Sequence, residues 1–244
     1  MMHIDLNCDL GEGSGHDAEL MPLISSANIA CGAHAGDVST MRSSVALAAR
    51  HGVAVGAHPG YADQENFGRR EIPLPETALR ELVVGQITRL REMGPVRHVK
   101  PHGALYNVAA RDRVVADVIA DAVGEVDPSL ILFALAGSEL ATAGRRRGLM
   151  VAEEVFADRS YQSNGCLTPR TRADALINDE DHVVTQVLQM VRSGTVRATD
   201  GTQVKIKADT VCLHGDGPNA VKLAVALRRE LVLAGITVRA FESA

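Results

Sequence analysis

The chain has 244 residues, of which 46% are apolar and 23% are charged, so it can bury a substantial core. Its formal net charge of -5 removes the electrostatic reason to bind nucleic acid or an anionic membrane surface. The four cysteines lack zinc-ribbon or disulfide-framework spacing, and we find neither a secretory signal nor an apolar run of about 20 residues. We therefore expect a single domain over residues 1–244 in the cytoplasm, without a nucleic-acid or membrane partner.

The first predicted strand covers residues 3–7, where polar and apolar side chains alternate. Asp5 and Asn7 lie on one face of it, and Asp9 follows as the chain leaves the strand. Further strands are expected at residues 27–30, 53–57, 98–100, 130–135, 149–155, 210–213 and 236–241. Helices are expected at residues 17–25, 38–51, 76–93, 111–123, from Ser138 onward, 181–192 and 219–234.

Three segments interrupt this alternation. Residues 59–75 form a long loop in which Arg69 and Arg70 suggest an anion clamp or lid, although a solvated surface excursion is the alternative. Residues 159–181 are rich in loop-forming residues, and we interpret them as a second flap over a site. Residues 195–207 contain Asp200-Gly201 between two short strands, which predicts a β-hairpin as an insertion or a partner-facing edge.

About eight strands, nearly all followed by helices, predict a parallel sheet, most economically a closed TIM-like (β/α) barrel of seven to eight units. An open doubly wound sheet is the alternative. The sequence contains neither G-x-G-x-x-G after the first strand nor G-x-x-x-x-G-K-[ST] anywhere, the two phosphate signatures expected of such sheets. We therefore favour the barrel, with the hairpin as a small insertion.

Ionisable side chains stand where the predicted strands end, and a closed barrel would bring them to one mouth. They are Asp5 and Asp9, His34, His58, Lys100 with His102, Glu153 with Asp158, and His214 with Asp216. Such a mouth could hold a divalent metal ion that activates water, or it could act directly as general acid and base. The spacing does not distinguish these mechanisms. Lys100 could bind a carboxylate or a phosphate, or serve as an amine nucleophile.

Seven short motifs occur in order along the whole chain. They are Asp5-Leu-Asn-Cys-Asp-Leu-Gly-Glu12, residues 26–37, Gly56-Ala-His-Pro-Gly60, Phe67-Gly-Arg-Arg70, residues 99–107, residues 154–159 and Cys212-Leu-His-Gly-Asp216. Together they resemble the LamB/YcsF family, which includes the A subunit of the prokaryotic ATP-dependent 5-oxoprolinase. The resemblance implies a barrel similar to the glycoside hydrolase and polysaccharide deacetylase superfamily. It also implies hydrolysis of 5-oxo-L-proline to L-glutamate, ATP as co-substrate, and partner subunits B and C.

On this basis we hypothesise that the partner subunits phosphorylate the lactam and that this chain opens the ring. The expected catalytic residues are Asp5, Lys100, His102 and His214. The expected substrate-binding residues are Asn7, Arg69, Arg70, Asn107 and Glu153. By analogy with the related deacetylases, the expected ligands of a divalent metal are Asp9, His34 and His58. Ala33 stands where an aromatic residue is common in the family, a difference that bears on substrate choice.

Two other functions fit the same mouth. A metal-dependent deacetylase or amidohydrolase would work alone, without ATP or partners, and would lose activity to chelators. A non-catalytic assembly subunit would dock through the hairpin and would tolerate changes at Asp5 and His102.

Overall fold

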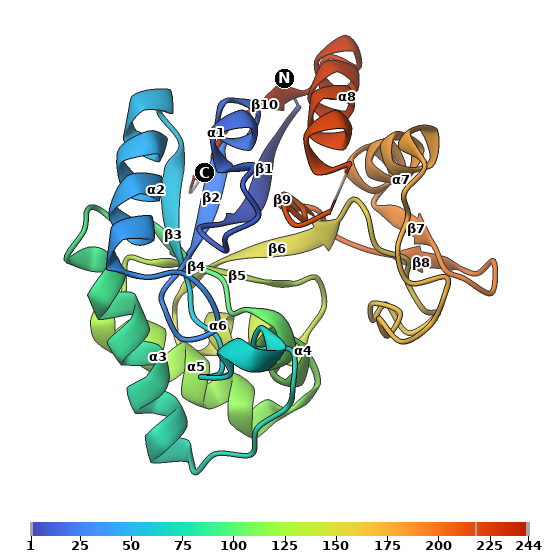
Figure 1. The fold of residues 1–244 in the computed structure, drawn as a ribbon. Helices are drawn as coiled ribbons and strands as arrows, with labels where there is room; N and C mark the ends of the chain where they lie inside the picture. The colour runs from blue at the N-terminus through green and yellow to red at the C-terminus, as the bar shows by residue number, and fades with distance from the viewer. Residues whose placement is uncertain (1, 218, 243–244) are drawn as a thin grey trace.

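The computed structural model describes residues 2–217 and 219–242, and its central feature is a ring of parallel strands (Figure 1). β1 pairs in parallel with both β2 and β9, which closes the ring. This geometry confirms the predicted TIM-like barrel. Around the ring the seven strands are β1 (His3–Leu10), β2 (Ser26–Ala30), β3 (Ala54–His58), β4 (His98–Val99), β5 (Ile131–Leu135), β6 (Met150–Phe156) and β9 (Thr210–Leu213).

Amphipathic helices cover the outside of the ring, and their ends follow local sequence signals. The Asp37 side chain accepts the Thr40 N–H at the start of α2, and Gly52 adopts a left-handed φ of 67° at its end, as the sequence predicts. At the start of α6, the Ser138 side chain likewise accepts the Ala141 N–H. The outer helices are α2 (Val38–His51), α3 (Glu76–Arg91), α5 (Arg113–Val126), α6 (Glu139–Arg146), α7 (Glu180–Ser193) and α8 (Ala220–Leu233).

Several short elements differ from the prediction. Residues 17–25 form one turn of α-helix, α1 (Asp17–Leu20), and one 3₁₀ turn, η1 (Met21–Leu23); a second 3₁₀ turn, η2 (Gln64–Asn66), lies in the long early loop. Helix α4 (Gly103–Arg111) was not predicted, because Pro101 and Gly103 favour a loop while the packing of buried Leu105 and Tyr106 favours a helix. The last strand, β10 (Thr237–Val238), is shorter than predicted and pairs with the start of β1, outside the ring.

The interior of the barrel is polar. Alternation along β1 turns Asp5, Asn7 and Asp9 inward, each at most 8% exposed, while Leu6 and Cys8 join the apolar layer beneath the helices. The predicted separation of the two faces is therefore confirmed. Because β1 continues to Leu10, Asp9 lies within the strand rather than after it.

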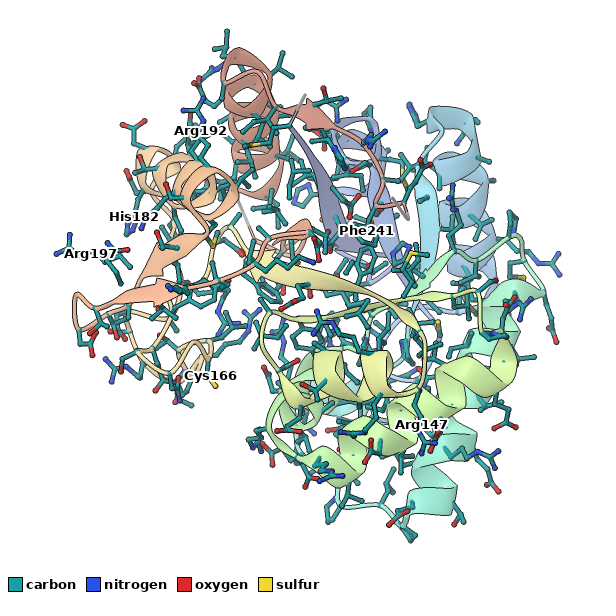
Figure 2. The ribbon with its side chains drawn as sticks, turned by 180° about the vertical axis from the view of Figure 1, so that it is seen from behind. Arg147, Cys166, His182, Arg192, Arg197 and Phe241 are labelled. Atoms are coloured by element: carbon teal, nitrogen blue, oxygen red, sulfur yellow. The ribbon has the colours of Figure 1, made fainter. Side chains whose placement is uncertain are left out.

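A two-stranded antiparallel sheet of β7 (Thr195–Arg197) and β8 (Gln203–Lys205) lies outside the ring and confirms the predicted hairpin. Residues 159–179, which we call the cover segment, run beside it, since Tyr161 forms a bridge with Ala198. Figure 2 shows Arg197 of the hairpin and Cys166 of the cover segment on one flank, away from Arg147. Within the described ranges, no helix is both long and apolar enough to cross a membrane. The organisation of residues 1–244 as one domain stays a prediction.

Candidate metal centre and catalytic cavity

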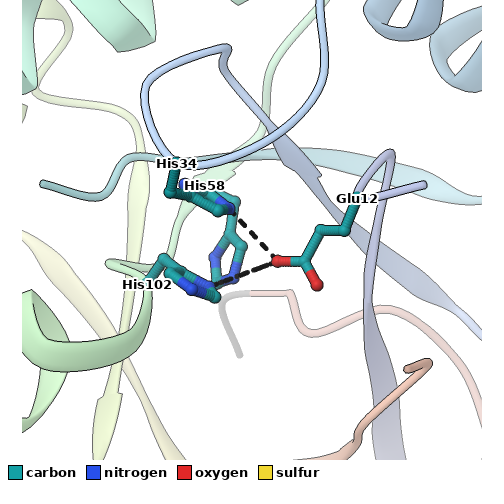
Figure 3. A group of neighbouring side chains, drawn as sticks. All are labelled: Glu12, His34, His58 and His102. Carbon is teal, nitrogen blue, oxygen red and sulfur yellow. Dashed lines mark hydrogen bonds and ion pairs between the residues drawn. The ribbon is translucent and has the colours of Figure 1, made fainter. Parts of the chain in front are cut away.

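One carboxylate and three imidazoles converge at the carboxyl ends of the first four strands (Figure 3). One possible ligand atom from each residue lies within 4.8 Å of those of the others. The Glu12 Oε1 atom is 3.2 Å from His34 Nε2, 3.2 Å from His102 Nδ1 and 3.6 Å from His58 Nε2. We call Glu12, His34, His58 and His102 the histidine cluster.

Main-chain carbonyls fix the orientation of two of these imidazoles. His58 Nδ1 is 2.8 Å from the carbonyl oxygen of Lys100, and His102 Nε2 is 2.9 Å from that of Phe67. A carbonyl only accepts, so these nitrogens carry the hydrogen, and His58 Nε2 and His102 Nδ1 face each other at 2.9 Å with lone pairs. Two lone pairs at that distance repel unless a proton or a metal ion lies between them. The cluster therefore favours a cation.

Charges around the cluster agree with this conclusion. Burial opposes a positive charge on His58, but the Asp9 and Glu12 carboxylates outweigh it and raise the pKa of His58. Imidazole nitrogens held by second hydrogen bonds, together with a carboxylate oxygen, form a donor set that suits zinc and other divalent first-row metals. The residues present thus fit a divalent metal ion.

His34 completes the cluster by stacking on His102, with ring centroids 3.8 Å apart and planes 2° apart. Glycines leave room for this stack, because a Cβ at Gly60 would come 2.8 Å from His34 Nδ1 and one at Gly68 would come 2.8 Å from His34 Cβ. Burial lowers the pKa of His34 to about 4. His34 therefore stays neutral near pH 7, which is the form that binds metals.

Lys100 lies in the barrel interior as a charged group. Its Nζ atom is 2.8 Å from Asp9 Oδ1, 2.9 Å from Glu154 Oε1 and 3.0 Å from Cys212 Sγ. Burial opposes the ammonium charge, but the Asp9 carboxylate and its neighbours outweigh burial and hold the pKa of Lys100 well above its ordinary value. An ammonium ion has no free electron pair, so the structure does not support Lys100 as an amine nucleophile.

The predicted metal ligands are only partly brought together. His34 and His58 lie in the cluster, whereas Asp9 lies beside it, with Oδ2 3.4 Å from His58 Nε2. Burial opposes ionisation of Asp9, but the charges of His58 and Lys100 keep the pKa of Asp9 well below its ordinary value. Glu12 and His102 take the remaining cluster positions.

Asp5 and Asn7 lie below the cavity rather than in its wall. Asp5 accepts hydrogen bonds from the hydroxyls of Ser25 and Ser26, each at 2.7 Å, and from that of Thr210. Asn7 accepts from Lys100 Nζ at 3.3 Å. Their positions do not support the predicted roles of Asp5 in catalysis and of Asn7 in substrate binding, because neither side chain reaches the cavity.

His214 follows β9, which lies between β6 and β1 in the ring, and it is held by a carboxylate. Its Nδ1 donates to Asp158, with both carboxylate oxygens at 2.9 Å, and this leaves Nε2 for a ligand. Burial opposes the negative charge of Asp158, but His214 outweighs it and holds the pKa of Asp158 below its ordinary value. A histidine oriented by a partly buried carboxylate can act as a general acid or base.

A cavity of about 640 Å³ joins these groups, with Asp9, Glu12, His102 and His214 in its wall and the cover segment along one side. Of the predicted substrate-binding residues, Arg69 and Asn107 line it. Arg70 does not: its side chain is 66% exposed and its Nε atom is 3.5 Å from Asp63. Its position does not support a role in the predicted anion clamp, because the loop turns Arg69 toward the cavity and Arg70 away from it.

Glu153 was predicted to bind substrate, but its side chain faces the helices, where it accepts from the Gly137 N–H at 2.8 Å and pairs with Arg145. The next residue, Glu154, faces the barrel interior and accepts from the Tyr106 hydroxyl at 2.6 Å. Since neighbouring strand residues point to opposite faces, an error of one residue in phase exchanges these two glutamates. The position of Glu153 does not support the predicted role.

Glu12 is the main site residue that the sequence interpretation missed. It follows Gly11, outside any periodic segment, so strand alternation gave no direction for its side chain. Its place at the end of the first family motif was the available signal. Arg159 and Arg170 were likewise not among the predicted site residues, although both line the cavity.

The sequence profile of the LamB/YcsF family matches residues 4–244 of this chain. The chain belongs to the LamB/YcsF family. Two relatives within it are the A subunits of 5-oxoprolinase from Bacillus subtilis (54% identical over 250 residues, 98% of this chain and 97% of theirs) and Bacillus licheniformis (53% over 253 residues, all of both chains).

Two solved structures are similar to this chain. A lactam utilization protein from Thermus thermophilus superimposes with a TM-score of 0.93 and 45% identity, over 98% of this chain and all of its own. The T48 deacetylase superimposes with a TM-score of 0.52 at 13% identity, over 97% of this chain and 87% of its own. At that identity the second likeness shows the barrel fold alone.

Proposed function

We propose that this chain is the A subunit of a 5-oxoprolinase and hydrolyses the lactam of 5-oxo-L-proline to L-glutamate. Relatives of that name are about half identical to it over nearly their whole length, and the Thermus thermophilus protein is named for lactam utilization. The observation that carries the proposal is a single cavity with a cation-favouring cluster on one side and the His214–Asp158 pair on the other. Opening an amide needs both an activated water and a proton donor for the leaving nitrogen.

The histidine cluster would hold a divalent metal ion through Glu12, His34, His58 and His102. Such an ion polarises a carbonyl oxygen or lowers the pKa of a bound water. We expect about one divalent ion per chain in elemental analysis of the purified protein. A purified chain that is active and free of metal would contradict this part of the proposal.

Two side chains of the cavity are placed for proton transfer. One carboxylate oxygen of Asp9 accepts from Lys100. The other takes a proton from the attacking water while the water oxygen bonds to the lactam carbonyl carbon. The ring C–N bond then breaks, and His214 Nε2 gives a proton to the nitrogen that becomes the amine of glutamate. Asp158 orients His214 for this transfer.

ATP as co-substrate, the subunits B and C, and a cytoplasmic location are also part of the proposal. An amide is stabilised by resonance, so a phosphoryl group on its carbonyl oxygen would make attack by water favourable. Ring opening would then leave an acyl phosphate, and a second water would hydrolyse it to glutamate and inorganic phosphate. The relatives are named as one lettered subunit of 5-oxoprolinase, which implies further subunits in those proteins. Free thiols at Cys8, Cys31, Cys166 and Cys212 fit a reducing compartment.

Glutamate release from 5-oxo-L-proline, measured with and without ATP and with and without the two partners, tests the proposal. We expect release only when ATP and both partners are present. Release by this chain alone without ATP would contradict the proposal and favour a stand-alone metal-dependent amidohydrolase, for which the cluster is also suited. Full release by the His102→Ala variant in the complex would favour a non-catalytic assembly subunit.

A further inference from the structure

Two arginines in the cavity wall form no ion pair with a described carboxylate. Within the described ranges four arginines line the cavity, and two of them are paired: Arg69 with Asp216 at 2.6 Å and Arg111 with Glu71 at 2.5 Å. The other two, Arg159 and Arg170, have no described carboxylate within 4 Å. The end of the cavity beside the cover segment is therefore positively charged.

Arg159 is the rigid member of this pair. It is 5% exposed, and it donates from Nε to the Ala175 carbonyl at 3.2 Å and from Nη2 to the Thr168 carbonyl at 2.6 Å. These bonds use two of the five N–H groups of a guanidinium and fix its plane. Burial and the neighbouring charge of Arg170 lower the pKa of Arg159 to about 10, so it stays charged near pH 7. A buried cation without a partner is costly, and a bound anion would remove that cost.

The arginine pair continues a sequence of groups along the cavity. Asp158, which precedes Arg159 in the chain, holds His214 and feels the charge of Arg170. His214 follows β9, which pairs with β1, the strand that contains Asp9, and Asp9 lies 3.4 Å from His58 of the histidine cluster. The cluster, His214 and the arginines thus follow one another. In a lactam acid such as 5-oxoproline, the carbonyl carbon, the ring nitrogen and the carbon that bears the carboxylate are consecutive in the same order.

We propose that Arg159 and Arg170 form the subsite for the substrate's carboxylate, with Arg159 fixed and Arg170 closing on the anion from the exposed side. This assignment rests on the proposed function. A guanidinium matches a carboxylate in two parallel hydrogen bonds, so the subsite would select lactam acids over lactams that lack the acid group. The same carboxylate stays in place after ring opening as the α-carboxylate of glutamate. The subsite replaces the Arg69 and Arg70 clamp that the sequence suggested.

Isothermal titration calorimetry of the purified full-length chain with 5-oxo-L-proline and with 5-oxo-L-prolinamide tests the subsite. Arg170→Met is the test variant. Arg172→Met is the matched control, because Arg172 belongs to the same segment, is exposed, does not line the cavity and pairs with Asp174 at 2.7 Å. We expect the unchanged chain to bind the acid at least about tenfold more tightly than the amide. Arg170→Met should remove that preference by weakening only the acid, and Arg172→Met should change neither affinity.

Three outcomes would overturn the assignment: no binding of the acid, equal binding of acid and amide, or equal effects of the two variants. Inorganic phosphate provides a further arm. If phosphate binding requires Arg170 while the affinity for 5-oxo-L-proline does not, the pair serves a phosphoryl group and the carboxylate assignment is wrong.

Glutamate release by the complex with ATP separates failure of the subsite from failure of the proposed function. If the complex with the unchanged chain releases glutamate, and the complex with Arg170→Met does so with the same KM for 5-oxo-L-proline, only the subsite is rejected. No release by the unchanged chain, with carboxylate-dependent binding intact, would reject the function and leave the subsite standing.

Discussion

The two sides of the cavity both present histidine, but they hold it in different ways. On the side of β1 to β4, main-chain carbonyls accept from His58 and His102, whereas on the side of β6 and β9 the Asp158 carboxylate accepts from His214. A carbonyl acceptor fixes the direction of the lone pair on the other ring nitrogen, while a carboxylate acceptor also places a negative charge behind the ring. The acceptor behind the ring therefore separates a residue suited to hold a cation from one suited to carry a proton.

Removal of one cluster histidine should have the largest effect. We expect His58→Ala to lose the metal ion and to lower glutamate release by the complex about 10³-fold or more, because metal activation is worth several kcal/mol. Metal content by elemental analysis and turnover in the complex measure the two effects. His182→Gln, a change at an exposed position on α7, is the control and should alter neither. Full metal content in His58→Ala would contradict the assignment of the β1 to β4 side of the cavity to cation binding.

Removal of the proton carrier should lower turnover and leave metal content unchanged. We expect His214→Gln to reduce kcat by about 10²-fold or more, the usual contribution of a general acid. Asp158→Asn should lower kcat less than His214→Gln does, because His214 stays in place but loses the carboxylate that orients it. Loss of metal in His214→Gln would place His214 on the cluster side instead.

Packing around the cluster should matter less than its ligands. We expect Gly60→Ala to weaken metal affinity about 10-fold to 100-fold, because the added methyl would come 2.8 Å from His34 Nδ1 and would displace the stacked ring. Gly85→Ala is the matched control, since a Cβ there meets nothing within 4 Å and the residue lies in helix α3. Competition with a metal chelator measures both. Equal affinities in the two variants would show that His34 does not depend on this space.

The residues beneath the cavity should affect stability more than turnover. Burial raises the pKa of Asp5 from 3.8 to about 6, although three hydroxyls oppose the shift. The native state therefore binds the proton more tightly than the unfolded chain, and the stability that this gives is complete below pH 3.8 and is lost as the pH rises through 6. The difference amounts to about 3 kcal/mol.

Asp5→Asn cannot ionise, so its stability relative to the unchanged chain should improve by up to about 3 kcal/mol between pH 4 and pH 8. Urea unfolding at the two pH values measures this change. Turnover in the complex should stay within about twofold, because Asp5 does not line the cavity. A loss of turnover above about 10²-fold with no change in the pH dependence of stability would restore Asp5 as the base.

Strand ends could be predicted well because a closed barrel leaves them little freedom. His34, Lys100 and His102 each follow a strand and His58 ends one, all within two residues of a glycine or a proline, and parallel strands bring their carboxyl ends to one mouth. Helix α2 likewise has the predicted bounds, because Asp37 and Gly52 mark both of its ends. In these places local signals and topology agree.

Side-chain direction could not be predicted where neither a local sequence signal nor the topology determines it. Glu153 and Glu154 are the same residue type on a strand buried on both faces, so the sequence did not fix which one points inward. Adjacent Arg69 and Arg70 lie in an irregular loop, where no period says which arginine faces the site. The pairing of Arg69 with Asp216, 147 residues away, depends on tertiary structure alone.

Closure of the ring between β1 and β9 also sets an order of assembly during synthesis. The cluster residues lie between positions 12 and 102, so the first four strands can bring them together while the rest of the chain is still on the ribosome. His214 follows β9. In that strand Thr210 pairs with Asp5 of β1, which lies 205 residues earlier in the chain. Contacts of such long range form late. We therefore expect a nascent chain to gain its affinity for metal before it gains its proton donor.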